Sequence, residues 1–184
     1  MGPIFLIVYL YYPFLGIGLP FLPFVLLALL IIAELSDLLD GYFARKQNQV
    51  TDLGKILDPM ADSIFRISVF LTFTQGMIQL PLILVFVFIY RDMVISTLRT
   101  VCALRGVALG ARRSGKIKAV IQAIVAFFIL MTMIPYSFGL LGLNTLRAMS
   151  FYAVLLAALY TLGSGAEYLI VHREYIKKAL LRKK

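Results

Sequence analysis

Four aspartates in one short polar stretch have the residue type and the spacing of a metal site. Asp37 and Asp40 are three residues apart, and Asp58 and Asp62 are four apart, so each pair falls on one face of a helix. Carboxylates gathered beside a membrane segment are costly unless cations offset them. Hard divalent cations such as Mg²⁺ take oxygen ligands and neutralise charge on a transferring phosphoryl group. The stretch therefore predicts a site for one or two divalent cations that is suited to phosphoryl transfer.

Two glycines, an arginine and a threonine nearby are candidates for contacts to a phosphate-containing ligand. Gly41 follows the second aspartate directly and Gly54 precedes the third by one turn, so a ligand could approach the backbone there. Arg45 could bind a phosphate through its guanidinium, and Thr51 could donate its hydroxyl. Taken singly, such residues are as often caps and interfacial anchors. Only the whole set indicates a site.

The composition indicates the kind of protein that must position these residues. Of 184 residues, 61% are hydrophobic, and the mean hydropathy is +0.94, which is too apolar for a soluble domain of this size. The single Cys102 excludes an internal disulfide, and the lone His172 has too few partners for a metal site. We expect an all-α integral membrane protein with one domain, residues 1–184.

Six apolar stretches are long enough, or nearly so, to cross a membrane, which takes about 20 helical residues. Turn formers and polar residues separate them, and they cover residues 4–20, 22–45, 55–78, 80–104, 115–137 and 147–171. The first is the weakest, because Pro13 and two glycines interrupt it. No basic segment precedes it and no small-residue cleavage site follows it, which favours a retained helix over a signal peptide.

Basic residues predict the orientation of these stretches. Fourteen of the 18 lysines and arginines lie within residues 45–55, 105–118 and 173–184, and such residues stay on the cytoplasmic side. With six spans, both termini and the aspartate site face the cytoplasm, as in a multi-pass protein of the cell (inner) membrane. The charges lie at helix ends and carry no groove-lining pattern, so they indicate topology and contact with anionic membrane lipids, and not binding of nucleic acid.

A second set of cations could bind an anionic substrate. Arg91 and Arg99 are eight residues apart in one apolar stretch, where each is costly unless it faces a polar cavity. More cations lie around the start of the next stretch, namely Arg112, Arg113, Lys116 and Lys118. We expect Arg91, Arg99, Arg112, Lys116 and Lys118 to bind the phosphate of an acceptor substrate. For Arg112, Arg113 and Lys118, a role in topology alone is the alternative.

The aspartate stretch resembles the signature of the CDP-alcohol phosphotransferases, D-x2-D-G-x2-A-R-x8-G-x3-D-x3-D. All eight fixed positions are present: Asp37, Asp40, Gly41, Ala44, Arg45, Gly54, Asp58 and Asp62. The resemblance implies the fold of that family, with six transmembrane helices, and a homodimer. It implies displacement of CMP from a CDP-linked substrate by a hydroxyl group.

The resemblance also implies roles for individual residues. The four aspartates would bind two ions of Mg²⁺ or Mn²⁺, with Asp62 serving in addition as general base on the incoming hydroxyl. Gly41, Arg45 and Thr51 would contact the CDP group. The resemblance assigns no role to Glu34 or Glu167. From position alone, Glu34, one turn before the first aspartate, is a candidate to support the site, and Glu167 is a candidate to pair with a neighbouring helix.

Within the family, residues 30–125 are most similar to the phosphatidylglycerophosphate synthases, which use CDP-diacylglycerol and glycerol 3-phosphate. Two features depart from the family pattern: no amphipathic segment precedes the first apolar stretch, and Ser63 stands where many members have lysine or arginine. Serine or inositol phosphate is therefore an alternative acceptor. A small cation transporter is a remote alternative, because it would need acidic residues in both halves of the chain, whereas six of nine lie between Glu34 and Asp62.

Overall fold

The computed structural model describes residues 1–46, 52–104 and 112–181, and the side chains of these except residues 37, 38, 40–46, 52–62 and 177–181. The described residues form helices and no strand, which confirms the all-α prediction. The six helices are α1 (Gly2–Tyr11), α2 (Leu22–Lys46), α3 (Asp52–Phe73), α4 (Leu82–Leu104), α5 (Arg113–Ser137) and α6 (Leu143–Leu181).

The last five expected stretches correspond to α2 through α6, but the first does not form a helix over its full length. The prediction of a helical span over residues 4–20 is wrong in extent, because α1 ends at Tyr11 and is ten residues long. Pro13 has no backbone N–H to donate to the preceding turn, and Gly16 has a φ of +70°, which closes a turn and not a helix. The chain then reverses toward α2.

Within the part of the chain whose side chains are described, two helices have the length and apolarity needed to cross a membrane, Arg113–Ser137 and Leu143–Ile176. The same part of the chain contains three shorter apolar helical segments, Gly2–Tyr11, Leu22–Ser36 and Ser63–Phe73. Large apolar side chains are exposed on the outer surface of the bundle, including those of Leu156 and Ile170 on α6. Surfaces of this kind indicate a protein that packs against lipid.

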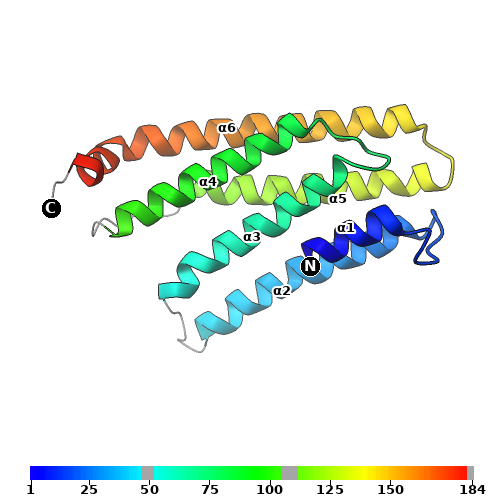
Figure 1. Cartoon of the computed structure of the whole chain (residues 1–184), viewed down its shortest axis with the longest axis horizontal. Coiled ribbons are helices and arrows are strands. Elements are labelled where there is room, and N and C mark those ends of the chain that lie inside the picture. Colours follow the sequence, from blue (N-terminus) through cyan, green and yellow to red (C-terminus); the bar gives the residue numbers. More distant parts are fainter. Residues whose placement is uncertain (47–51, 105–111, 182–184) are drawn as a thin grey trace.

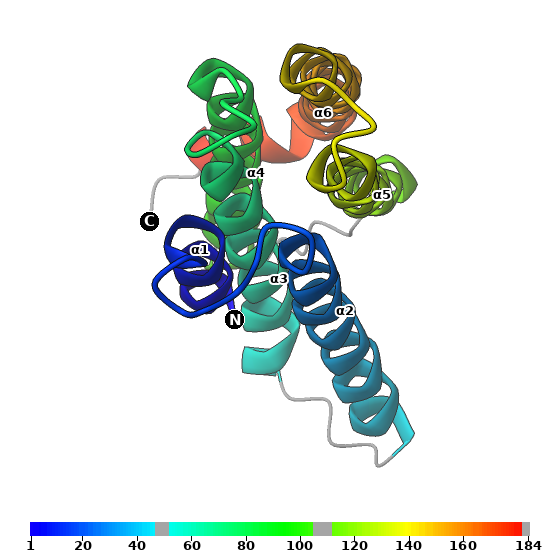
Figure 2. The same cartoon turned by 90° about the vertical axis from the view of Figure 1, so that its right-hand side faces the viewer.

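The helices run back and forth along the long axis of the molecule (Figure 1). Helix α3 packs on α1, α4 and α5, while α6 packs on α4 and α5, and α2 packs on α1 and α5. Viewed along the bundle, α3 therefore lies in the middle (Figure 2). The C-terminal ends of α2, α4 and α6 lie toward the left of Figure 1, where α3 and α5 begin.

Aromatic side chains fill the core where α1, α3 and α4 meet. Phe5 and Tyr9 of α1 both pack edge-on against Phe73 of α3, with ring centroids 5.8 and 5.9 Å apart. Phe70 of α3 packs against Phe88 of α4 at 5.0 Å. All five side chains are almost fully buried, so this cluster fixes α1 and α4 on α3.

The loop between α3 and α4 is held against α1. Tyr9 Oη donates a hydrogen bond to the carbonyl of Gln75 and accepts one from the N–H of Ile78, each at 3.2 Å. Gly76, with a φ of +64°, passes so close to Tyr9 that a Cβ atom added there would lie 2.8 Å from the ring carbon Cε1. Glycine is required at this position for two reasons, its backbone conformation and the missing side chain.

The substitution Gly76→Ala is expected to destabilise the protein more than Gly139→Ala does. Both glycines have positive φ, 64° and 74°, so both substitutions cost about 1–2 kcal/mol in backbone conformation. Only Gly76 also meets a side chain, because nothing lies within 4 Å of a Cβ added at Gly139. Thermal unfolding of the purified variants in detergent compares them. Equal midpoints would contradict the close packing of Tyr9 on the loop.

Candidate active site

The four signature aspartates lie in the halves of two helices that face the same side of the bundle. Asp37 and Asp40 are in the C-terminal half of α2, and Asp58 and Asp62 are in the N-terminal half of α3, with Asp62 at its midpoint. The C-terminal end of α2 and the N-terminal end of α3 both lie toward the left of Figure 1. The helical position expected for each pair is confirmed, and so it is for Gly41 and Arg45, which also lie on α2. The side chains of the four aspartates and Arg45, the surroundings of Gly41, and Thr51 as a whole lie outside the described part of the structure, so their ligand roles stay predictions.

A buried group of three charged side chains joins α4 to α5; we call it the Arg91 cluster, formed by Arg91, Asp92 and Lys118. The Asp92 carboxylate accepts hydrogen bonds from Lys118 Nζ at 2.8 and 2.7 Å and from Arg91 Nη1 at 3.0 Å. The Lys118 side chain is 4% exposed, and those of Arg91 and Asp92 are 11% and 10% exposed. Charges so deeply buried persist only when paired. One carboxylate between two cations leaves one positive charge in excess.

Two glycines on neighbouring helices make room for Arg91. A Cβ atom added at Gly115 of α5 would lie 3.4 Å from Arg91 Nη2, and one added at Gly165 of α6 would lie 3.1 Å from Arg91 Cγ. The Arg91 side chain thus fits tightly beside Gly165 and lies at ordinary contact distance from Gly115. Its Nε atom is buried without a hydrogen-bond partner among the described residues. A buried donor without a partner is costly, so this position suits a ligand that brings an acceptor.

The other cations expected to bind an acceptor phosphate are more dispersed. Arg99 lies on α4 beside Tyr168 of α6. Arg112, the residue before α5, forms a 2.7 Å ion pair with Glu167 of α6, which confirms the expected pairing of this glutamate with a neighbouring helix. Lys116 is exposed. The structure therefore brings Arg91 and Lys118 together through Asp92, and places Arg112 in a separate, partly exposed pair.

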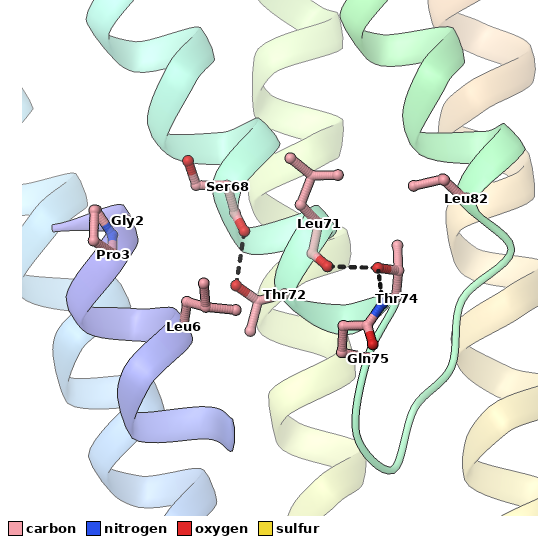
Figure 3. Close-up of a pocket in the computed structure, with 9 residues that line it drawn as sticks. All are labelled: Gly2, Pro3, Leu6, Ser68, Leu71, Thr72, Thr74, Gln75 and Leu82. Atoms are coloured by element: carbon pink, nitrogen blue, oxygen red, sulfur yellow. Dashed lines mark hydrogen bonds between the residues drawn. The ribbon is translucent and has the colours of Figure 1, made fainter. Parts of the chain in front are cut away.

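A cavity of about 420 Å³ lies between α1, α3 and the start of α4 (Figure 3). Its hydroxyl groups are engaged locally, since Ser68, Thr72 and Thr74 each donate to a backbone carbonyl of α3, at 2.8, 2.8 and 2.7 Å. It contains no charged side chain, and its lining residues are Gly2, Pro3, Leu6, Ser68, Leu71, Thr72, Thr74, Gln75 and Leu82. The cavity does not carry the groups that phosphoryl transfer needs, which lie nearer the other end of α3.

Comparison with known proteins identifies the family. The sequence model of the CDP-alcohol phosphatidyltransferase family matches residues 3–162, most of the chain and all of the signature. The chain belongs to this family. It is therefore a phosphatidyltransferase, and the predicted resemblance is confirmed.

Several relatives of this CDP-alcohol phosphatidyltransferase carry one name, CDP-diacylglycerol–glycerol-3-phosphate 3-phosphatidyltransferase. The protein from Bacillus subtilis is 35% identical over 149 residues, which cover 81% of this chain and 74% of its own length. The protein from Treponema pallidum is 31% identical over 137 residues, covering 73% of this chain and 63% of its own. The protein from Rickettsia typhi is 30% identical over 149 residues, covering 80% and 79%.

The residues of this phosphatidyltransferase fit a divalent cation at the α2–α3 ends. The donor set is four carboxylates, the oxygen ligands that Mg²⁺ and Mn²⁺ prefer, contributed as two pairs by two helices. On the turn before Asp37, the Oε1 atom of Glu34 is buried and has no hydrogen-bond partner among the described residues. Carboxylate oxygens in such surroundings favour a nearby cation. In the described side chains alone, no group of three metal-ligating residues occurs.

The sequence did not assign a role to the residues that hold Arg91, namely Asp92, Gly115 and Gly165. One signal for Asp92 was available: it is one of only three acidic residues after Asp62, and it stands directly beside an arginine in an apolar stretch. A buried acid in such a stretch needs a cationic partner. No comparable signal marks the two glycines, because their importance comes from packing between helices.

Proposed function

We propose that this phosphatidyltransferase moves the phosphatidyl group of CDP-diacylglycerol to glycerol 3-phosphate, releasing CMP and phosphatidylglycerol phosphate. The observation that carries the proposal is that relatives covering most of the chain are named for this donor and this acceptor. The excess positive charge of the Arg91 cluster supports it, because an acceptor that carries a phosphate needs cations. Serine carries no phosphate, so it would make no use of this feature.

The reaction needs a base for the acceptor and charge neutralisation for the donor. A primary hydroxyl of glycerol 3-phosphate attacks the phosphorus that carries the diacylglycerol, the bond from that phosphorus to CMP breaks, and the Asp62 carboxylate takes the hydroxyl proton. Two Mg²⁺ or Mn²⁺ ions, when held by Asp37, Asp40, Asp58 and Asp62, supply neutralisation of the charge on the transferring group. Asp62 would combine both roles, as metal ligand and as base.

The remaining predicted residues bind the two substrates. Gly41, Arg45 and Thr51 contact the CDP group of the lipid donor, where Gly41 leaves space and Arg45 can bind phosphate through two parallel hydrogen bonds. The positive charge for the acceptor phosphate comes from the cations assigned from the sequence, Arg91, Arg99, Arg112, Lys116 and Lys118, and the part that Lys118 plays is refined below. Binding energy at the acceptor phosphate orients the distant hydroxyl for attack.

The membrane arrangement is part of the proposal. One domain, residues 1–184, contributes six helices to the membrane: α2 to α6 cross it, and α1, ten residues long, is too short to cross as a regular helix. The ends of α2 and α4 and the starts of α3 and α5 then face the cytoplasm at the inner membrane, where a lipid donor and a water-soluble acceptor can meet. The grouping of basic residues near these ends supports the orientation. We expect a homodimer surrounded by membrane lipid.

Purified protein, assayed with CDP-diacylglycerol and one acceptor at a time, tests the choice of acceptor. We expect release of CMP with glycerol 3-phosphate, and little release with serine or inositol phosphate. For serine, the reason is that an acceptor without a phosphate leaves the buried cations of the acceptor site unpaired. For inositol phosphate, which does carry a phosphate, the reason is that the relatives share glycerol 3-phosphate as the acceptor in their name. CMP release with serine and none with glycerol 3-phosphate would overturn the proposed acceptor, while the family assignment would stand.

A further inference from the structure

The two cations of the Arg91 cluster have unequal surroundings. We propose that Asp92 is a positioning residue that orients the Arg91 guanidinium toward the acceptor phosphate, and that Lys118 anchors Asp92 without binding phosphate itself. The inference rests on the proposed function, since it takes Arg91 as a ligand of glycerol 3-phosphate. It refines the assignment of Lys118, which the sequence alone placed among the phosphate-binding cations.

Lys118 is buried and directed at Asp92. Its Nζ atom donates to both oxygens of the Asp92 carboxylate, at 2.8 and 2.7 Å, and only 3% of the residue is exposed. An ammonium has three donors, and two of them are used on one carboxylate that also balances its charge. Because its charge is balanced by Asp92 and its side chain is buried, Lys118 has less to offer a phosphate than Arg91 has. Lys118 therefore serves to fix Asp92 between α4 and α5.

Arg91 has donors to spare. Its Nη1 atom donates to Asp92 at 3.0 Å, whereas its Nε atom is buried and has no partner among the described residues. A guanidinium offers five donors in a rigid planar fork that matches the oxygens of a phosphate. Fixing one end of that fork determines where the others point. Asp92 provides this fixed point, and Gly115 and Gly165 leave the space in which the arginine lies.

Since Lys118 holds Asp92 and Asp92 orients Arg91, we can predict the effect of combining substitutions. Asp92→Asn and Lys118→Met should each raise the KM for glycerol 3-phosphate about 10-fold, the size of effect for one charge-assisted hydrogen bond, with the KM for CDP-diacylglycerol unchanged. Because Lys118 acts only through Asp92, adding Lys118→Met to Asp92→Asn should raise the KM no further. A general loss of structure would instead change kcat and both KM values.

The opposite results overturn the inference. If the fold increase in KM of the double variant equals the product of the fold increases of the two single variants, Lys118 binds the phosphate directly. If Asp92→Asn leaves the KM for glycerol 3-phosphate unchanged, Asp92 positions nothing. Wild-type turnover with glycerol 3-phosphate is measured first, because its absence is a failure of the proposed function. Multiplicative effects in an active enzyme contradict only the indirect role of Lys118 through Asp92.

A second pair of variants leaves every charge in place. It tests the placement of Arg91 even if the variants that remove a charge do not fold. In Gly165→Ala the new Cβ lies 3.1 Å from Arg91 Cγ, so it should shift the arginine and raise the KM for glycerol 3-phosphate. The matched control is Gly163→Ala on the same helix, where nothing lies within 4 Å. We expect a wild-type KM for the control. Equal KM values for the two variants would show that the placement of Arg91 does not matter.

Discussion

Asp62→Asn is expected to lower kcat by about 10²- to 10⁴-fold, which is the usual contribution of general acid–base catalysis. Asparagine has nearly the shape of aspartate, but its amide does not accept a proton from a hydroxyl at neutral pH. Binding of both substrates should be largely retained, because neither depends on this proton transfer. The measurement is kcat and both KM values at saturating Mg²⁺.

Asp52→Asn is the matched control for this experiment. Asp52 lies in the same polar stretch and begins α3, but it is outside the aspartate signature. It is the kind of residue that caps or flanks a helix start, so its loss should change stability slightly and kcat little. Near-normal kcat for Asp62→Asn, or an equal loss for both variants, would contradict the role of Asp62 as the base.

Asp37→Asn and Asp58→Asn are expected to raise the Mg²⁺ concentration needed for half-maximal turnover. Each removes one charged oxygen ligand, and the shift should be at least about 10- to 100-fold, because that is the loss when a residue that merely orients a ligand is removed. A chelator should abolish the activity of the wild-type enzyme, and added Mg²⁺ or Mn²⁺ should restore it. Titration of turnover against Mg²⁺ measures the effect in each variant.

The same titration of the Asp52→Asn variant provides the comparison. Its curve should coincide with that of the wild type, since Asp52 is not expected to hold a cation. If Asp37→Asn and Asp58→Asn also gave wild-type curves, the four aspartates could not be the metal ligands. Activity that survives the chelator undiminished would reject the dependence on metal as a whole.

Much of the helical fold could be predicted from apolar stretches and turn formers. The stretches 80–104 and 115–137 nearly coincide with α4 and α5, because apolar composition and flanking polar residues directly determine where such helices start and end. The predicted helical span over residues 4–20 was too long, because apolar composition does not distinguish a helix from a turn. There Pro13 and Gly16 decided the backbone, and α1 ended at Tyr11.

The candidate site was predictable only in part, for a physical reason. The aspartate pairs could be recognised because residues three or four apart share a helix face. The contact between Asp92 and Lys118 joins residues 26 positions apart, on helices whose rotation and depth come from packing. Likewise, Gly165 matters only because α6 places it against Arg91. Local spacing contains no information on either contact.

Transfer of labelled glycerol 3-phosphate into lipid tests the central claim most directly. Purified protein in vesicles that contain CDP-diacylglycerol and Mg²⁺ should convert the label into phosphatidylglycerol phosphate. One CMP should be released for each lipid formed, and omission of either the donor or the metal should stop the reaction. If labelled serine entered lipid under these conditions and labelled glycerol 3-phosphate did not, the proposed function would be contradicted.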